Sequence, residues 1–158
     1  MRCVLSELAG AIDIWQAWGD FVDDVGDRKG GWDWYATLTF RDPPIEEILR
    51  GWTKVGMGFS RRACDGFLRL LGDMKGLNTQ HWFRAREYQR DRGVPHYHLL
   101  IGGVEELRRR EAWEWWYANF GFARILPYET DKGARFYLCK YVTKELGDFE
   151  FSDNLVLS

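Results

Sequence analysis

The sequence predicts an α+β fold in which helices pack on a central antiparallel β-sheet. The first observation is the order of local patterns, β-α-β-β-α-β-α, in which short segments rich in aromatic and β-branched residues are separated by longer segments with apolar residues at helical spacing. The second is that two strand segments follow each other through a short turn, a connection that joins antiparallel strands. The chain has 158 residues, enough for one domain with a single core.

The predicted elements follow in order along the chain. The helical segments are 3–24, ended by the sequence DRKGG, then 45–76, 105–121 and 134–147. The strand segments are 32–40, 81–90, 95–104 and 122–129, and residues 149–158 are expected to add a short edge strand. Gly56 and Gly58 are expected to interrupt the second helix, whereas Gly121 and Gly147 are expected to cap the last two.

Charge is distributed unevenly along the chain, whose total is −2. Residues 1–27 carry a net charge of −5, residues 28–144 carry +7 and residues 145–158 carry −4. We expect a single domain over residues 1–158, with a core of about 32–146 to which an acidic N-terminal helix is added. A basic centre is compatible with phosphate binding, because local charge sets the field, although acidic ends also simply favour solubility.

The three cysteines, Cys3, Cys64 and Cys139, are far apart in the sequence. An odd number without metal-ligand spacing argues against a disulfide framework and against a zinc knuckle. No apolar run approaches the ~20 residues of a membrane span, and the N-terminus lacks the pattern of a secretory signal. The sequence therefore predicts a soluble protein of a reducing, intracellular compartment.

Two histidines, His96 and His98, stand one residue apart in a strand segment. Side chains alternate between the faces of a strand, so both imidazoles share one face and Tyr97 points to the other. Buried imidazoles each need a polar partner, and two of them are well placed to bind one metal ion. A pair of satisfied surface histidines is the alternative, and His81 is given no role.

The hairpin adds a carboxylate to this pair. If the turn has an even number of residues, Glu87 lies directly opposite His96, and Ala85 lies opposite His98. Directly opposed Cβ atoms are about 5 Å apart, and the small Ala85 leaves room for an ion. Two imidazoles and one carboxylate suit Mn²⁺, and Mg²⁺ is also compatible. A turn of odd length would place Glu87 on the opposite face.

The helical segment near the C-terminus carries two tyrosines and two lysines at helical spacing. Tyr137 and Tyr141 are four residues apart and share one face, while Lys140 and Lys144 share an adjacent one. A tyrosine becomes a nucleophile when cations or a metal stabilise its phenolate. A core face beside a solvated lysine face is the other interpretation.

Together these segments resemble the HUH endonucleases, specifically the rolling-circle replication initiators of plasmids and single-stranded DNA phages. ATLTF (36–40) is similar to the first family motif, PHYHLLI (95–101) to the metal motif, and YLCKYVTK (137–144) to the tyrosine motif. The resemblance covers about residues 32–146. It implies an RRM/ferredoxin-like core in which Glu87, His96 and His98 bind Mg²⁺ or Mn²⁺.

By the same resemblance, the protein nicks single-stranded DNA at a replication origin, forming a 5′-phosphotyrosine and a free 3′-hydroxyl. Tyr141 is the first choice of nucleophile because it stands in a KYxxK context with Lys140 and Lys144. Tyr137 is either a second nucleophile or a structural neighbour. The implied setting is the cytoplasm of a prokaryotic host, without membrane contact, and the implied partners include a host or viral helicase and polymerase.

Basic and aromatic residues are the expected contacts to DNA. The arginines expected at backbone phosphates are Arg41, Arg61, Arg62, Arg108, Arg109 and Arg110. Arg84 and Arg86 share the face opposite Glu87, so they are not assigned to the active site. Trp32, Trp34 and Trp82 either stack bases or pack in the core.

Three other functions remain open from the sequence. One is an HUH-type transposase, and another is a non-catalytic module that binds single-stranded nucleic acid. The third is a metal-dependent hydrolase that uses water as its nucleophile, which would leave no covalent product. Neither a binding module nor a hydrolase gives the YxxKYxxK pattern a purpose.

Overall fold

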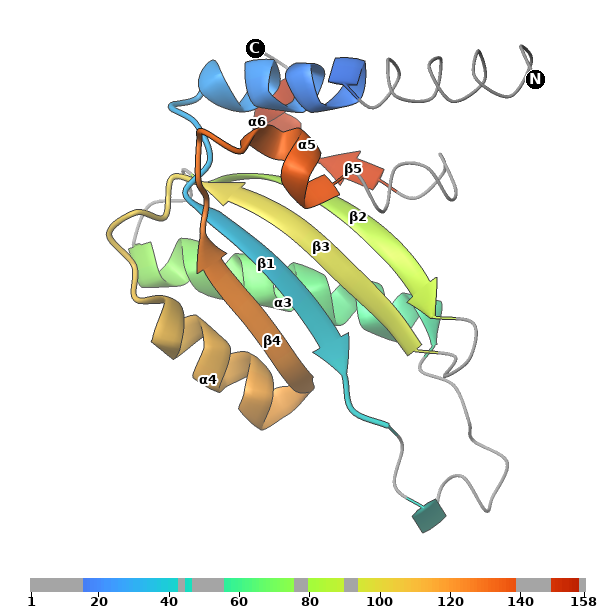
Figure 1. Cartoon of the computed structure of the whole chain (residues 1–158). Coiled ribbons are helices and arrows are strands. Elements are labelled where there is room, and N and C mark those ends of the chain that lie inside the picture. The colour runs from blue at the N-terminus through green and yellow to red at the C-terminus, as the bar shows by residue number, and fades with distance from the viewer. Residues whose placement is uncertain are drawn as a thin grey trace, which may run out of the picture.

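The computed structural model describes residues 16–42, 45–46, 56–75, 80–89, 94–138 and 149–156 (Figure 1). Five antiparallel strands form one sheet in the order β4-β1-β3-β2-β5. The strands are β1 (Trp34–Phe40), β2 (His81–Gln89), β3 (Val94–Gly102), β4 (Gly121–Pro127) and β5 (Phe149–Phe151). The α+β fold with a central antiparallel sheet is therefore confirmed.

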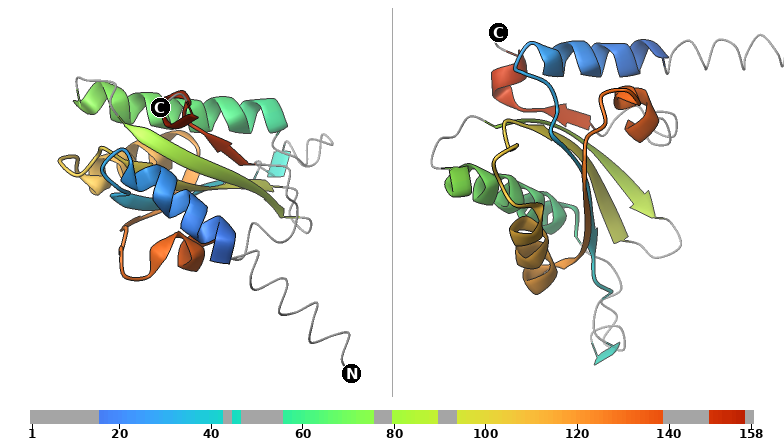
Figure 2. Two further views of the ribbon diagram at one scale, coloured as in Figure 1. Left: turned by 90° about the horizontal axis from the view of Figure 1, so that it is seen from above. Right: turned by 60° about the vertical axis from the view of Figure 1, so that its left-hand side comes forward.

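Helices pack on both faces of this sheet. The labelled helices are α3 (Met57–Lys75), α4 (Arg109–Asn119), α5 (Gly133–Leu138) and α6 (Asp153–Val156), and residues 16–27 form a further helix. Figure 2 shows α3 and α4 on one side of the sheet, with α5 and the helix of residues 16–27 on the other.

The face under α3 and α4 forms the larger core. Cys64, Phe67 and Leu71 recur at helical spacing on α3 and are fully buried, which explains why this segment is an amphipathic helix. They pack with Leu38 of β1 and Trp116 of α4 among other apolar side chains. Trp34 belongs to this core too, and Trp82 is packed against it, so core packing accounts for both tryptophans.

The opposite face has a second core. It brings together Val22 of the first helix, Trp32, Tyr137 of α5 and Leu155 of α6 over Leu100 of β3. Trp32 is buried there, and its indole nitrogen donates to the Val22 carbonyl oxygen at 3.2 Å. Of the two alternatives left open by the sequence, base stacking or core packing, core packing thus accounts for all three tryptophans.

Several element boundaries differ from the sequence prediction. The third helix begins at Arg109 rather than at 105, because the Leu107 amide donates to the Val104 carbonyl in a turn. Gly58 lies inside α3 instead of interrupting it, and α6 was not anticipated. Residues 3–15, Gly147 and most of the predicted helix 134–147 lie outside the described residues.

The prediction that Gly121 caps a helix is wrong, because Gly121 is the first residue of β4. Phe120 occupies the C-cap of α4. A Cβ at Gly121 would lie 2.3 Å from the carbonyl oxygen of Thr39, so only glycine lets β4 pair this closely with β1. Close approach of two backbones, and not a left-handed turn, explains the residue here.

None of the described helices is long and apolar enough to cross a membrane.

Candidate active site

The two histidines of β3 lie in two neighbouring rows that run across the sheet. Glu87 of β2 is paired with His96 and Ala85 is paired with His98, so the predicted register of this hairpin is confirmed. The turn that sets this register, residues 90–93, lies outside the described residues. Directly paired residues share a face, so Glu87, His96 and His98 point to the same side of the sheet.

Hydroxyl groups of β1 extend both rows on the other side of β3. Thr39 is paired with His96, and Thr37 is paired with His98. The Thr39 hydroxyl lies 3.0 Å from Nδ1 of His96. The alternation of strand β1 thus places two threonines beside two histidines, an arrangement that requires the non-local pairing of β1 with β3.

His98 is held from both ring nitrogens. Its Nε2 lies 3.3 Å from Oε2 of Glu87, and its Nδ1 lies 3.2 Å from the hydroxyl of Tyr35. Thr37 donates to that same hydroxyl at 3.3 Å. In the tautomer that satisfies these contacts, the Tyr35 hydroxyl donates to Nδ1 and Nε2–H donates to the carboxylate.

Burial keeps His98 neutral. Its side chain is 4% exposed, and burial, together with the neighbouring His96, lowers the pKa of His98 from its ordinary 6.5 to about 3. A neutral imidazole retains a lone pair on one nitrogen. His98 is therefore in the protonation state that a metal ligand requires.

The donor set fits a divalent cation by its chemistry and register, but its side chains do not yet converge. No three His, Cys, Asp or Glu side chains among the described residues are arranged to hold a metal ion as they stand. Glu87 instead engages His98 directly. Binding of Mg²⁺ or Mn²⁺ by Glu87, His96 and His98 would therefore need a change of side-chain rotamers.

Tyr137 lies in the second core, where its ring contacts Tyr35, the residue whose hydroxyl contacts His98. It is 8% exposed, its ring packs 4.8 Å from Tyr35 and 5.1 Å from Tyr128, and its hydroxyl accepts a hydrogen bond from the Glu129 amide at 3.0 Å. The remaining tyrosine-motif residues lie outside the described residues, namely Lys140, Tyr141 and Lys144.

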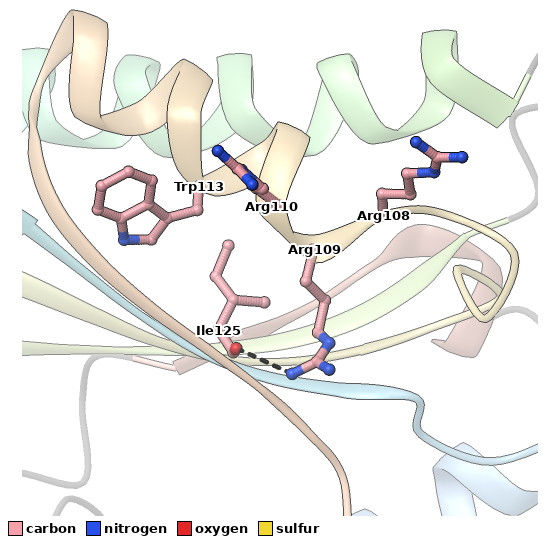
Figure 3. Close-up of a pocket in the computed structure, with 5 residues that line it drawn as sticks. All are labelled: Arg108, Arg109, Arg110, Trp113 and Ile125. Carbon is pink, nitrogen blue, oxygen red and sulfur yellow. Dashed lines mark hydrogen bonds between the residues drawn. The ribbon is translucent and has the colours of Figure 1, made fainter.

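The expected DNA-binding arginines fall into two groups. Arg61 and Arg62 are exposed on α3, where Arg61 pairs with Glu150 at 2.7 Å. The other group lies along α4. Arg108, Arg109 and Arg110 line a cavity of about 460 Å³ with Trp113 and Ile125 (Figure 3).

Arg41 belongs to the second group, at the opposite end of α4. Its guanidinium lies 4.9 Å from the centre of the Tyr117 ring and donates to the Tyr117 carbonyl oxygen. Arg84 is excluded from the histidine face, as expected, because it is buried under α3 and pairs with Asp65 at 2.6 Å.

Sequence reasoning missed Phe122 and Arg124 of the edge strand β4. Phe122 is paired with Thr39 and Arg124 with Thr37, so both extend the histidine rows on the same face. Their alternation is visible in the sequence. Their proximity to the histidines is not, because it depends on β1 lying between β3 and β4.

The comparison with protein families gave one match. The family model described as Replication-associated protein ORF2 matches residues 33–146, more than half of the chain. This span runs from the residue before β1 through the histidine hairpin to the tyrosine motif, and leaves out the helix of residues 16–27. Neither the curated proteins nor the solved structures gave a match.

Proposed function

Because the chain belongs to the Replication-associated protein ORF2 family, we propose that it is a metal-dependent, single-stranded DNA endonuclease of the HUH type. It nicks a replication origin and leaves a 3′-hydroxyl from which a polymerase extends, while a helicase partner unwinds the duplex. The observation that carries this proposal is the register that puts Glu87, His96 and His98 on one face of the sheet.

Glu87, His96 and His98 hold the divalent cation, Mg²⁺ or Mn²⁺. Two imidazoles and a carboxylate leave coordination positions for phosphate oxygens. The neutral state of His98 and the small Ala85 beside it support this assignment. When bound, the cation acts as a Lewis acid on the scissile phosphate.

Tyr141 supplies the nucleophile. Its hydroxyl oxygen forms a bond to phosphorus as it loses its proton, and the bond from phosphorus to the 3′ oxygen breaks. The departing 3′ oxygen takes up a proton to become the free hydroxyl, and a 5′-phosphotyrosine remains. Lys144 and Lys140 stabilise the phenolate and the phosphate charge.

Tyr137 serves as the structural neighbour of this nucleophile. Its burial and the hydrogen bond from the Glu129 amide to its hydroxyl support a packing role. The alternative of two alternating nucleophiles would require that buried hydroxyl to leave its partner.

The decisive experiment is a search for a covalent protein–DNA adduct. The protein is incubated with labelled single-stranded origin oligonucleotides in Mn²⁺ and resolved on a denaturing gel. We expect an adduct that carries the label from the 3′ side of the break, is absent in EDTA, and is lost in Tyr141→Phe but kept in the matched control Tyr137→Phe. An adduct lost only in Tyr137→Phe would refute the assignment of Tyr141, and cutting without an adduct would favour water as the nucleophile.

A non-catalytic DNA-binding module is the second candidate function. The observation in its favour is that Glu87 and His98 are hydrogen-bonded to each other, so the described residues satisfy these groups without a metal. Under this function the protein binds the origin oligonucleotide equally well with Mn²⁺ or with EDTA, and never cuts it.

A further inference from the structure

We propose that α4 and the edge strand β4 form a track on which single-stranded DNA lies as it reaches the histidine face. The inference rests on the proposed function, because it names the surface that guides the substrate strand to that site. The track consists of three exposed rings, Trp113, Tyr117 and Phe122, with arginines along it.

The three rings form a continuous series. Trp113 and Tyr117 are one helical turn apart, and their ring planes are nearly parallel, 11° apart, with centroids separated by 5.0 Å. Tyr117 then meets Phe122 edge-on at 5.8 Å. The exposed fractions of these residues are 37%, 42% and 61%, so each ring offers surface to a ligand. Exposed rings in series can stack the bases of a single strand whatever its sequence. Here Trp113 and Phe122 are the rings expected to receive bases, because Tyr117 already contacts both Trp113 and Arg41.

The series passes around the edge of the sheet at β4, from α4 on one face to Phe122 on the histidine face, and ends at the histidine rows. Phe122 is paired with Thr39, which is paired with His96, which is paired with Glu87. Neighbouring strands are about 4.8 Å apart, so Phe122 is two strand spacings from His96 on the same face. A strand that stacks on Phe122 is thereby delivered beside the proposed metal ligands.

Positive charge accompanies the rings at both ends. Arg109 extends from the start of α4 toward β4, and the Trp113 indole lies over the same strand one turn further along the helix (Figure 3). Arg41 lies over the Tyr117 ring, and the exposed Arg124 is next but one to Phe122 on β4. Glu114 offsets some of this charge, since it pairs with Arg110 at 2.8 Å.

The edge of β4 is closed to an added peptide strand, which favours nucleic acid over protein as the occupant. The Trp113 indole nitrogen donates to the Ala123 carbonyl oxygen at 2.9 Å, and Arg109 donates to the Ile125 carbonyl oxygen at 3.3 Å. Carbonyls that an incoming strand would need are thus already occupied. What remains exposed at this edge is ring surface and charge, which is the chemistry of a single-stranded nucleic acid site.

The test is binding of fluorescent single-stranded DNA to the full chain in EDTA, so that no cutting intervenes. We expect Phe122→Ala and Trp113→Ala each to weaken binding of a short strand, about 12 nucleotides long, on the order of tenfold. Weak duplex binding should stay unchanged, because the bases of a duplex are stacked on one another and offer no free face. Trp113→Phe keeps a ring and should retain most of the affinity. Phe21→Ala is the matched control, since Phe21 is 49% exposed but lies on the helix of residues 16–27.

The outcomes separate this inference from the proposed function. Wild-type affinity in Phe122→Ala and Trp113→Ala, or an equal loss in Phe21→Ala, would overturn the track. Tighter binding of an RNA of the same sequence would also overturn it. Adduct formation in Mn²⁺ is measured in parallel with binding in EDTA. Loss of binding in the track variants without any adduct in the wild type would support the track and refute nicking, and an adduct with unchanged binding in those variants would do the opposite.

Discussion

The hydroxyl groups of β1 face the two histidines of β3, and they explain why tyrosine and threonine recur at every second position there. Tyr35 and Thr37 serve His98, and Thr39 serves His96. An imidazole that binds a metal through Nε2 usually donates its Nδ1–H to such a partner, which fixes the ring orientation and the tautomer. Metal binding would therefore reverse the direction of the hydrogen bond between Tyr35 and His98. At the residue scale, β1 thus completes the proposed metal site without contributing a ligand.

Replacement of Thr39 by valine tests this role. The change keeps the shape of the side chain but removes the partner of His96 Nδ1, so we expect Mn²⁺ affinity to fall about tenfold, while Thr39→Ser retains it. Isothermal titration calorimetry with Mn²⁺ measures both variants. Unchanged affinity in Thr39→Val would show that the hydroxyl does not orient the histidine.

Tyr137 gives a second prediction at this scale. Tyr137→Phe leaves the ring packed between Tyr35 and Tyr128 but leaves the Glu129 amide without its acceptor. We expect the free energy of unfolding to fall by about 1 kcal/mol. Urea unfolding measures the change, and a loss close to zero would mean that water replaces the hydroxyl.

At the scale of the elements, Arg84 connects three secondary-structure elements that are distant in the sequence, namely β2, α3 and β5. From β2 it reaches Asp65 of α3 at 2.6 Å and Glu150 of β5 at 2.5 Å, and its guanidinium lies 4.8 Å from the centre of the Trp82 ring. The arginine side chain is 5% exposed, whereas the two carboxylates are 41% and 38% exposed. This network attaches the short edge strand β5 to the sheet and to α3.

We expect Arg84→Met to lower the free energy of unfolding by about 3 kcal/mol, because two carboxylates lose their shared partner. The matched control is Arg61→Met, which breaks an exposed pair with Glu150 and should cost less than about 1 kcal/mol. Denaturant unfolding compares the two variants. Equal losses would mean that burial of Arg84 adds nothing to the network.

For the whole molecule, one sheet separates two cores of different purpose. The core under α3 and α4 contains mostly large apolar side chains. The opposite core, under the helix of residues 16–27 and α5, adjoins the histidine rows and contains hydrogen-bonded tyrosines, among them Tyr128, whose hydroxyl donates to Asp23 at 2.5 Å. The larger apolar core and the proposed metal site thus lie on opposite faces of the sheet.

Cys64 is buried in the larger core, and its thiol makes the free energy of unfolding vary with pH in the alkaline range. Burial raises the pKa of its thiol from 9.0 to about 12, although the nearby Arg84 opposes the change. Between these values the unfolded chain releases the proton and the folded protein keeps it. The free energy of unfolding therefore falls as pH rises from 9 toward 12, by at most about 1.4 kcal/mol per pH unit.

Cys64→Ala removes this contribution, so its stability should fall less steeply between about pH 9 and pH 10.5. Urea unfolding of both proteins at matched pH values gives the two slopes, and all other titratable residues are common to the two proteins. Identical slopes would show that the buried thiol does not contribute.

The sequence by itself determined the fold class and most strand positions, and it determined the register of the histidine hairpin on the condition that the turn has an even number of residues. Glu87 and His96 are close in the chain, so alternation and a short turn of even length are sufficient to place them on one face. The hairpin pattern predicted from the sequence agrees with the structure because the pairing of β2 with β3 joins segments that are adjacent in the chain.

Only the tertiary structure decided that β1 is the second neighbour of β3 and that β4 lies beyond it. This order determines which hydroxyls contact the histidines and which edge residues reach their face. Pairing of Thr39 with His96 joins residues 57 positions apart, and no local pattern selects that partner. The requirement for glycine at Gly121 and the place of Phe122 follow from the same non-local pairing. Such contacts depend on how whole elements share one core, which a local pattern does not encode.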